Sequence, residues 1–345
     1  MHASKQLIRT SMVFSTRHNT TFQPTMWVVL IVLLVVFFLL DLSCGSVWIS
    51  LSQLWNPTNP IDVDILLNLR LPRAITALLA GIALSVSGLL VQTLFANPLA
   101  GPYTLGVSNG AGLGVAIVTM CATTIGTQHF VVGNVSIVFA AIVGSTIVLM
   151  IVIGVAKFLR DNVSLLIVGM MFGSIAGAVV NLLQNFANPD ALKLFVVWTL
   201  GSLTTVGWNE LPIFAIVLIL GIVFAFTLIK PLNGMMLGEQ YARGLGISMQ
   251  RLRVFIVIAT GLLAGGVTAF CGPIAFIGVA VPHLARGLFA TANHRTIMPA
   301  TAIIGAILLL LCDILTSLFT YPLPISTVSA LFGAPIIIAI ILRNK

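Results

Sequence analysis

Few side chains in this sequence can do chemistry, and their spacing favours binding over catalysis. The 345 residues include only 8 acidic and 16 basic side chains, with 5 histidines and 4 cysteines. No His-Glu-x-x-His zinc motif, Gly-x-Ser-x-Gly nucleophile elbow or Gly-x-x-x-x-Gly-Lys-Ser/Thr phosphate loop occurs. We therefore predict no catalytic residue, no ATPase site, no metal site and no cofactor in this chain.

The remaining reactive residues also have simple interpretations. Asp313 lies inside an apolar stretch, where a carboxylate can couple transport to an ion gradient. Because Asp313 is near the outer end of that stretch, we expect it to cap a helix or to reach water. His283 is interpreted as a packed or interfacial histidine. The cysteines lack metal-ligand spacing and are read as buried apolar residues: Cys44, Cys121, Cys271 and Cys312.

The composition requires a membrane as solvent. Hydrophobic residues make up 59% of the chain, charged residues 7%, and the mean hydropathy is +1.15, whereas about a quarter of residues in soluble domains are charged. We predict an all-α polytopic protein with about ten transmembrane helices. The predicted spans are 26–43, 72–95, 104–123, 133–157, 163–187, 211–230, 252–271, 275–290, 296–318 and 326–342.

The basic residues predict the orientation. When the apolar stretches cross the membrane alternately, all but three of the 16 basic residues lie on one side, which is the cytoplasmic side by the positive-inside rule. Both termini are then cytoplasmic, with a tail at residues 1–25 and one transmembrane domain at residues 26–343. Because these charges are scattered singly, the net charge of +8 gives no indication of nucleic-acid binding. The three outer exceptions are Arg70, Arg73 and Lys193.

Two of these exceptions form a motif at the start of the second span. Pro72 suits a first helical turn and leaves Arg70 and Arg73 one turn apart on the outer side. The two cations could bind an acidic partner or anchor the helix end at lipid phosphates, and the residues alone leave both alternatives open. Lys193 belongs to the apolar stretch 191–203, which is too short to cross and is predicted to form a helix at the outer surface.

The largest polar interruption on the inner side is residues 231–250. It predicts a short helix ending at Gly244 and Gly246, followed by a second helix that starts at Ser248. Glu239 and Arg243 would be exposed there. The segment is either a docking surface or a solvated loop.

Several motifs resemble one family. Gly-Glu-x-x-Ala-Arg-x-Leu-Gly at residues 238–246 is similar to the coupling loop of permease subunits in binding-protein-dependent ABC importers for iron-siderophore complexes, haem and cobalamin, the FecCD-type permeases. Further stretches agree with that family: Arg70-Leu71-Pro72-Arg73, Asn97-Pro98-Leu99-Ala100-x-Pro102, Leu105-Gly106-Val107-Ser108-Asn109-Gly110-Ala111, Gly272-Pro273-Ile274-x-Phe276-Ile277-Gly278, Val281-Pro282-His283-Leu284-Ala285-Arg286 and Leu331-x-Gly333-Ala334-Pro335. The resemblance covers about residues 70–343.

The resemblance implies a function and partners. It implies the type II ABC importer permease architecture in a bacterial inner membrane, with alternating access driven by two cytoplasmic ATPase subunits. A periplasmic or lipid-anchored binding protein and a second permease copy, forming a homodimer, are the other implied partners. The alternative is an ion-coupled secondary transporter acting without an ATPase, for which Asp313 is the one supporting residue.

The resemblance also assigns residues. The coupling loop comprises Gly238, Glu239, Ala242, Arg243, Leu245 and Gly246, and the binding protein docks at Arg70 and Arg73. The cytoplasmic gate comprises Asn97, Leu99, Asn162 and Val163, although the sequence departs from the family at the last two. It also departs near the outer end of the ninth span, where the family often has a basic residue and this chain has Asp313. The fifth and tenth spans are expected to line the path.

Overall fold

The computed structural model describes residues 22–45, 48–54, 59–121, 133–159, 161–319 and 323–343. Within these ranges all regular structure is helical, which confirms the all-α prediction. The predicted cytoplasmic tail, residues 1–25, lies outside the described residues up to residue 21.

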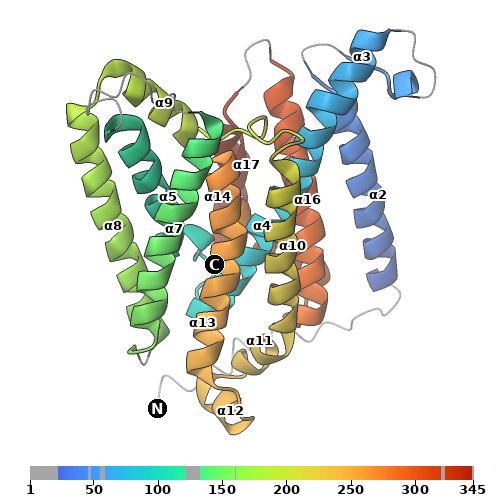
Figure 1. The fold of residues 1–345 in the computed structure, drawn as a ribbon. Helices are drawn as coiled ribbons and strands as arrows, with labels where there is room; N and C mark the ends of the chain where they lie inside the picture. Colours follow the sequence, from blue (N-terminus) through green and yellow to red (C-terminus); the bar gives the residue numbers. More distant parts are fainter. Residues whose placement is uncertain are drawn as a thin grey trace.

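A helix occupies every stretch that was predicted to span the membrane (Figure 1). These helices are α2 (Phe22–Ser43), α4 (Leu71–Phe95), α5 (Val107–Ala116) with the π-helix η4 (Ile117–Cys121), α7 (Asn134–Ala156), α8 (Asn162–Phe186), α10 (Leu211–Thr227), α13 (Met249–Thr260) with the π-helix η5 (Gly261–Gly265) and α14 (Gly266–Cys271), α15 (Ile277–Phe289), α16 (His294–Ser317) and α17 (Ile325–Arg343).

Not all of these helices are long enough to cross a bilayer. Six helical segments of the described chain have the length and hydropathy of a span, and α10 with α11 (Ile229–Met235), bent by 50°, makes a seventh. The segments within α5–η4, α15 and α17 are shorter apolar helices. A hydrocarbon core of about 30 Å needs about 20 helical residues. The number of crossings and the side on which each terminus lies therefore stay predictions.

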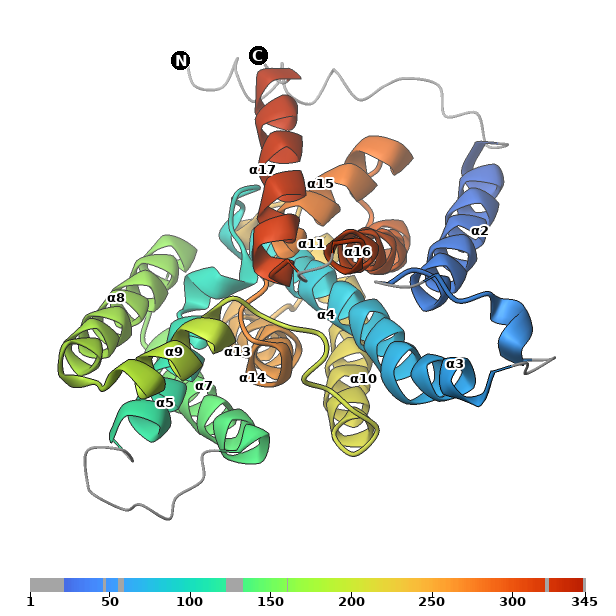
Figure 2. The same ribbon diagram turned by 90° about the horizontal axis from the view of Figure 1, so that it is seen from above.

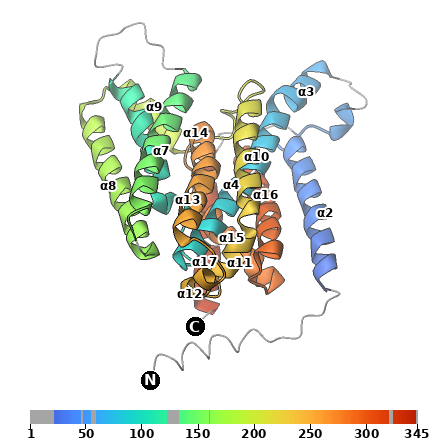
Figure 3. The same ribbon diagram turned by 60° about the horizontal axis from the view of Figure 1, so that its bottom comes forward.

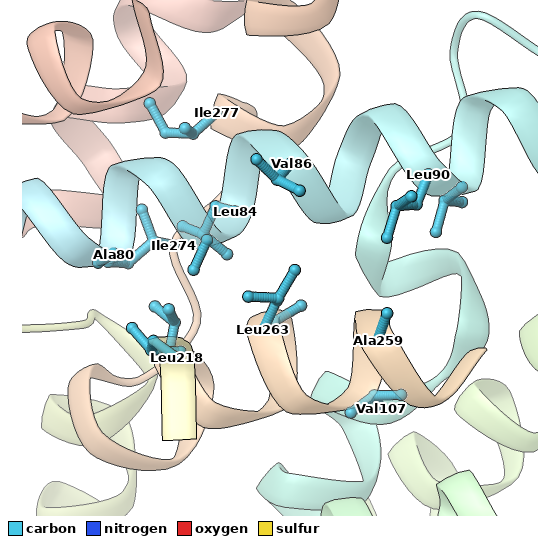
Figure 4. Close-up of a cluster of buried hydrophobic side chains, with 14 of the residues drawn as sticks. Ala80, Leu84, Val86, Leu90, Val107, Leu218, Ala259, Leu263, Ile274 and Ile277 are labelled. Carbon is cyan, nitrogen blue, oxygen red and sulfur yellow. The ribbon is translucent and has the colours of Figure 1, made fainter. Parts of the chain in front are cut away.

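Helix α4 runs obliquely through the centre of the bundle (Figure 2). It packs against α10, α13, α15 and α16. Figure 4 shows Leu84 and Val86 of α4 among side chains of the neighbouring helices, including Leu263 and Ile277. Leu84, Leu263 and Ile277 are fully buried. Because lipid removes the hydrophobic drive between helices, close packing of this kind holds such a bundle together.

Small residues let the helix backbones approach. A Cβ placed on Gly81 would collide with the carbonyl of Gly305 in α16, and one on Gly88 would collide with that of Gly278 in α15. These glycines therefore mark places where two helix backbones are in direct contact. Gly177 of α8, in contrast, has no atom within 4 Å of the position that a Cβ would take.

Short helices cover the two ends of the bundle. Helices α3 (Pro60–Asp64) and α9 (Pro189–Thr199) lie at one end, and α11 and α12 (Glu239–Gly244) lie at the other (Figure 1). The predicted surface helix at 191–203 corresponds to α9. The side chain of Asn188 caps it by accepting a hydrogen bond from the Ala191 amide at 2.8 Å.

Candidate functional site

The segment predicted as a coupling loop forms the helix α12, at the end of the molecule opposite α3 and α9 (Figure 3). Glycines bound it on both sides, since Gly238 has φ +107° and Gly246 has φ +82°. These conformations are costly for any residue with a Cβ. The chain then enters α13 at Met249, directly after the predicted start at Ser248.

The faces of α12 differ in exposure. Ala242 is fully buried, whereas Tyr241 and Leu245 are 57% and 58% exposed. Large apolar and aromatic side chains at this exposure, on a six-residue helix, are available to a partner. The predicted coupling-loop residues therefore lie together on one short helix and its two glycine ends, with Ala242 facing inward, and their docking to an ATPase stays a prediction.

Glu239 joins α12 to the rest of the bundle. Its Oε1 atom accepts from Arg243 Nη2 at 3.2 Å and from Arg253 Nη2 at 2.7 Å. The Arg243 side chain is 61% exposed, and that of Arg253 is only 3% exposed. The pair within α12 is therefore a solvated one of small energy. The bond from Arg253 is the one that positions the helix.

The two arginines predicted to dock a binding protein have different environments. Arg73 forms a bidentate ion pair with Asp313, with Nε and Nη2 at 2.9 and 2.6 Å from the two carboxylate oxygens, and Nη2 also donates to Thr316 Oγ1 at 2.8 Å. The side chain of Arg73 is 22% exposed and that of Asp313 is 1% exposed. The expectation that Asp313 caps a helix or reaches water is therefore wrong, because the ion pair holds it inside the bundle.

Arg70 holds the end of a neighbouring helix. Its Nη1 atom donates to the carbonyl oxygens of Leu42 and Ser43 at 3.0 and 2.6 Å. A cation at a helix carboxyl end satisfies carbonyls that lack partners within the helix. Arg70 thus caps α2 and brings it against the start of α4.

The same cluster contains a residue that sequence reasoning missed. Asp41, in the last turn of α2, is 6% exposed and lies beside the same cavity as Asp313. This cavity, of about 250 Å³, is lined by both aspartates and both arginines. Sequence reasoning assigned Asp41 no partner because Arg70, Arg73 and Asp313 lie 29 to 272 residues away in the chain.

The predicted gate consists of two turns, one after α4 and one before α8. Asn97 Oδ1 accepts from the Leu99 amide at 2.9 Å, which fixes the turn after α4 and leaves Leu99 51% exposed. His283 Nε2 donates to the Pro98 carbonyl at 2.7 Å, so this histidine packs against the turn as expected.

Asn162 and Val163 open α8, and Val163 is 61% exposed. Asp161 caps this helix through the Ser164 amide at 2.7 Å, and this hydrogen bond lowers the pKa of Asp161. No hydrogen bond in the described part of the chain joins either residue to Asn97 or Leu99. The pairing of these two turns into a gate stays a prediction.

The model of the FecCD transport family matches residues 33–343. The chain belongs to this family. The assignment agrees with the motifs at the coupling loop and at the start of α4. It makes the chain a multi-pass permease subunit of the ABC importer type, and the architecture is that of a type II permease.

Known relatives of this FecCD permease cover nearly the whole chain. It is 33% identical to YvrB, an uncharacterised ABC transporter permease protein of Bacillus subtilis (strain 168), over 90% of this chain and 91% of the relative. It is 35% identical to the vitamin B12 import system permease protein BtuC of Shigella boydii serotype 18, over 91% and 94%. A solved inward-facing structure assigned to the metal-chelate ABC transporter type matches with a TM-score of 0.83 and 29% identity, covering 93% of this chain and 99% of that one.

The described residues of this permease hold no group of three or more His, Cys, Asp or Glu side chains that could bind a metal ion. Cys271 and Cys312 are buried free thiols, as predicted, whereas Cys44 is only partly buried, so the prediction is wrong there.

Arg253 is the second residue that sequence reasoning missed, because it was counted only as an inner topological charge. The sequence held one signal for this role. Arg253 lies one turn into a span, 14 positions after Glu239 in a helix bounded by glycines.

Proposed function

We propose that this permease imports a metal chelate of the iron-siderophore, haem or cobalamin class across the bacterial inner membrane by alternating access. The observation that carries the proposal is the glycine-bounded helix α12, with its exposed Tyr241 and Leu245, in a chain of the FecCD family. The vitamin B12 permease relatives and the metal-chelate type structure support the substrate class.

The energy for transport would come from ATP hydrolysis by two ATPase subunits that bind α12. Gly238, Glu239, Ala242, Arg243, Leu245 and Gly246 form the coupling surface in this proposal. Ala242 packs inward and Glu239 fixes the helix from within, which leaves the exposed side chains to make the contact. Because the permease would contact the ATPase subunits only through this surface, it needs no residue that touches ATP.

Delivery of the chelate would use the opposite end of the molecule. A binding protein with acidic side chains docks at Arg70 and Arg73, and the partly exposed Arg73 exchanges Asp313 for a carboxylate of the partner. Exchange leaves Asp313 buried beside Asp41, which raises the free energy of the docked state. This chain would therefore bind its partner more weakly through Arg73 than a permease without that acid.

The path would lie between two permease copies. Helix α8 carries exposed apolar side chains such as Met170, Met171 and Ile175, a face that a second copy could cover. We assign the inner closure of this path to Asn97, Leu99, Asn162 and Val163. Leu99 and Val163 are exposed apolar side chains at the inner ends of α4 and α8, so they can close a passage by excluding water.

Transport by a purified system tests the proposal. The permease is reconstituted in liposomes with the ATPase and binding protein encoded beside it, and uptake of radiolabelled cobalamin, haem and ferric siderophores is followed. We expect ATP-dependent uptake of one chelate class, and none when the phosphate-loop lysine of the ATPase is replaced. Uptake without any ATPase subunit would contradict the proposal and would favour an ion-coupled secondary transporter.

A further inference from the structure

One buried guanidinium connects the coupling helix to the connection between α7 and α8. Arg253, in the second turn of α13, donates from Nη2 to Glu239 Oε1 at 2.7 Å and from Nη1 to the carbonyl of Leu159 at 3.0 Å. Glu239 is the first residue of α12, and Leu159 lies three residues before Asn162, the first residue of α8. One side chain thus contacts both segments.

The geometry of this link requires an arginine. A guanidinium presents several N–H donors in a fixed planar fork, so two acceptors in different directions can be bound at once. A lysine has a single nitrogen on a flexible stem and cannot hold both acceptors in the same fixed geometry. With 3% of its side chain exposed, Arg253 exchanges these partners for water only if the surrounding helices separate.

A second side chain of α13 holds the same connection, and in the described part of the chain it makes no hydrogen bond to α12. Gln250 Nε2 donates to the carbonyl of Lys157 at 2.7 Å. Lys157 and Leu159 follow α7, so α13 supplies donors to carbonyls at the carboxyl end of that helix. Gln250 is therefore a matched control, because its removal weakens the hold on the connection and leaves the link to α12 in place.

A cavity of about 590 Å³ lies between α12 and the connection, lined by residues that include Lys157, Arg243, Gln250 and Arg253. Beside this cavity, the hydrogen bonds of Arg253 join Glu239 of α12 to the Leu159 carbonyl of the connection. A movement of α12 can therefore reach the connection through this side chain.

We infer that Arg253 is the positioning residue that transmits movement of the coupling helix to the start of α8, and so to the inner gate. The inference rests on the proposed function, which supplies the ATPase contact at α12 and the gate at Asn162 and Val163. When the ATPase displaces α12, Glu239 moves with it, and the arginine fork draws the Leu159 carbonyl and the beginning of α8 along.

The test measures coupling separately from assembly. The complete complex of permease, ATPase and binding protein is placed in lipid nanodiscs, with spin labels at Ile167 of α8 and Leu288 of α15, which are 51% and 43% exposed, so that their distance reports movement of α8 against α15, and with the native cysteines replaced. The distance between the labels is measured by electron resonance with and without a non-hydrolysable ATP analogue. Uptake per ATP hydrolysed is measured in liposomes.

For Arg253→Met we expect normal recovery of the ATPase, continued ATP hydrolysis, a fall of about tenfold in uptake per ATP, and no nucleotide-dependent change in the label distance. Arg253→Lys should give a partial loss. Gln250→Met should keep the distance change and most of the uptake. A merely structural role for Arg253 would lower stability without separating hydrolysis from uptake.

Several results would overturn the inference. Wild-type uptake per ATP in Arg253→Met is one, and an equal loss in Gln250→Met is another. If Arg253→Met does not assemble, Arg253→Lys supplies the test, because it keeps the positive charge and loses the fork that binds both acceptors, and wild-type uptake per ATP in that variant would also overturn the inference. Failure of the wild-type chain to recruit an ATPase would instead contradict the proposed function.

Discussion

Replacing Arg73 by Met should destabilise the permease severely, and replacing its partner at the same time should restore most of the loss. Arg73 gives three N–H contacts of 2.6 to 3.0 Å to the carboxylate of Asp313. Without the guanidinium, Asp313 is left 1% exposed beside Asp41, a second carboxylate that is 6% exposed.

The expected loss of stability follows from the burial of this ion pair. Removing one partner of a buried ion pair costs about 3–5 kcal/mol, because the other charge keeps its desolvation penalty without compensation. Asp313→Leu should cost less, about 1–3 kcal/mol, since Arg73 is 22% exposed and can turn toward water. The double variant Arg73→Met, Asp313→Leu replaces both charges by apolar groups and should lie within about 1 kcal/mol of the wild type. The two single effects would then be far from additive.

Buried thiols provide the assay. Cys271 and Cys312 are almost inaccessible, so a maleimide dye that fluoresces on reaction reports unfolding in detergent. Cys44 and Cys121 are replaced by Ser to remove background. At about 2 °C per kcal/mol for a large domain, Arg73→Met should lower the melting temperature by about 5–10 °C.

Two outcomes would refute this reasoning. If Arg73→Met melts within about 1 °C of the parent, the ion pair adds nothing to folding. If the double variant melts at the temperature expected from the sum of the single losses, the two residues act independently, and the cost of a stranded buried charge is not the cause.

Three further predictions concern single positions. Gly88→Ala should reduce the yield of folded protein because its Cβ would collide with the backbone of α15, whereas Gly154→Ala, which meets no atom within 4 Å, should express normally in the same gel-filtration comparison. Gly246→Ala should cost about 1–2 kcal/mol through its positive φ and lower ATPase recovery in pull-downs, while Gly244→Ala should not. Hydrogen bonds from the first turn of α8 lower the pKa of Asp161. The stability that Asp161 adds is therefore present above the unfolded pKa of about 3.9 and is lost as pH falls through the lower folded value. The difference in melting temperature between the wild type and Asp161→Asn should shrink below about pH 4.

Hydrophobicity and local chain chemistry were sufficient to predict the helices. A helix lies in each predicted apolar stretch because a segment in lipid must satisfy its own backbone hydrogen bonds. The caps followed equally local rules, as at Asn188 before α9 and at Gly246 after α12. The helix ends were predicted less well than the helices themselves. Helix α15 was predicted at residues 275–290 and runs from Ile277 to Phe289, because Phe276 adopts φ +66° directly before it.

The contacts of the candidate sites could not be predicted in the same way. Arg73 and Asp313 are 240 residues apart, and their pairing depends on how α4 and α16 pack. The sequence placed Arg73 outside and Asp313 near water, since single-residue rules do not include a distant partner. Sequence reasoning missed Arg253 for the same reason, because its acceptors, Glu239 and the Leu159 carbonyl, belong to two other segments.

The glycine contacts divide the bundle mechanically. Gly81 and Gly88 bring α4 into backbone contact with α16 and α15, and Gly110 does the same for α5 and α7. Helices at this separation cannot slide past one another without first moving apart, because the ridges of one backbone lie against the carbonyls of the next. Any rearrangement of the permease must therefore carry α4, α15 and α16 as one rigid body and α5 with α7 as another. Helix α13 contacts both α4 and α7, so the hinge between the two bodies lies along it.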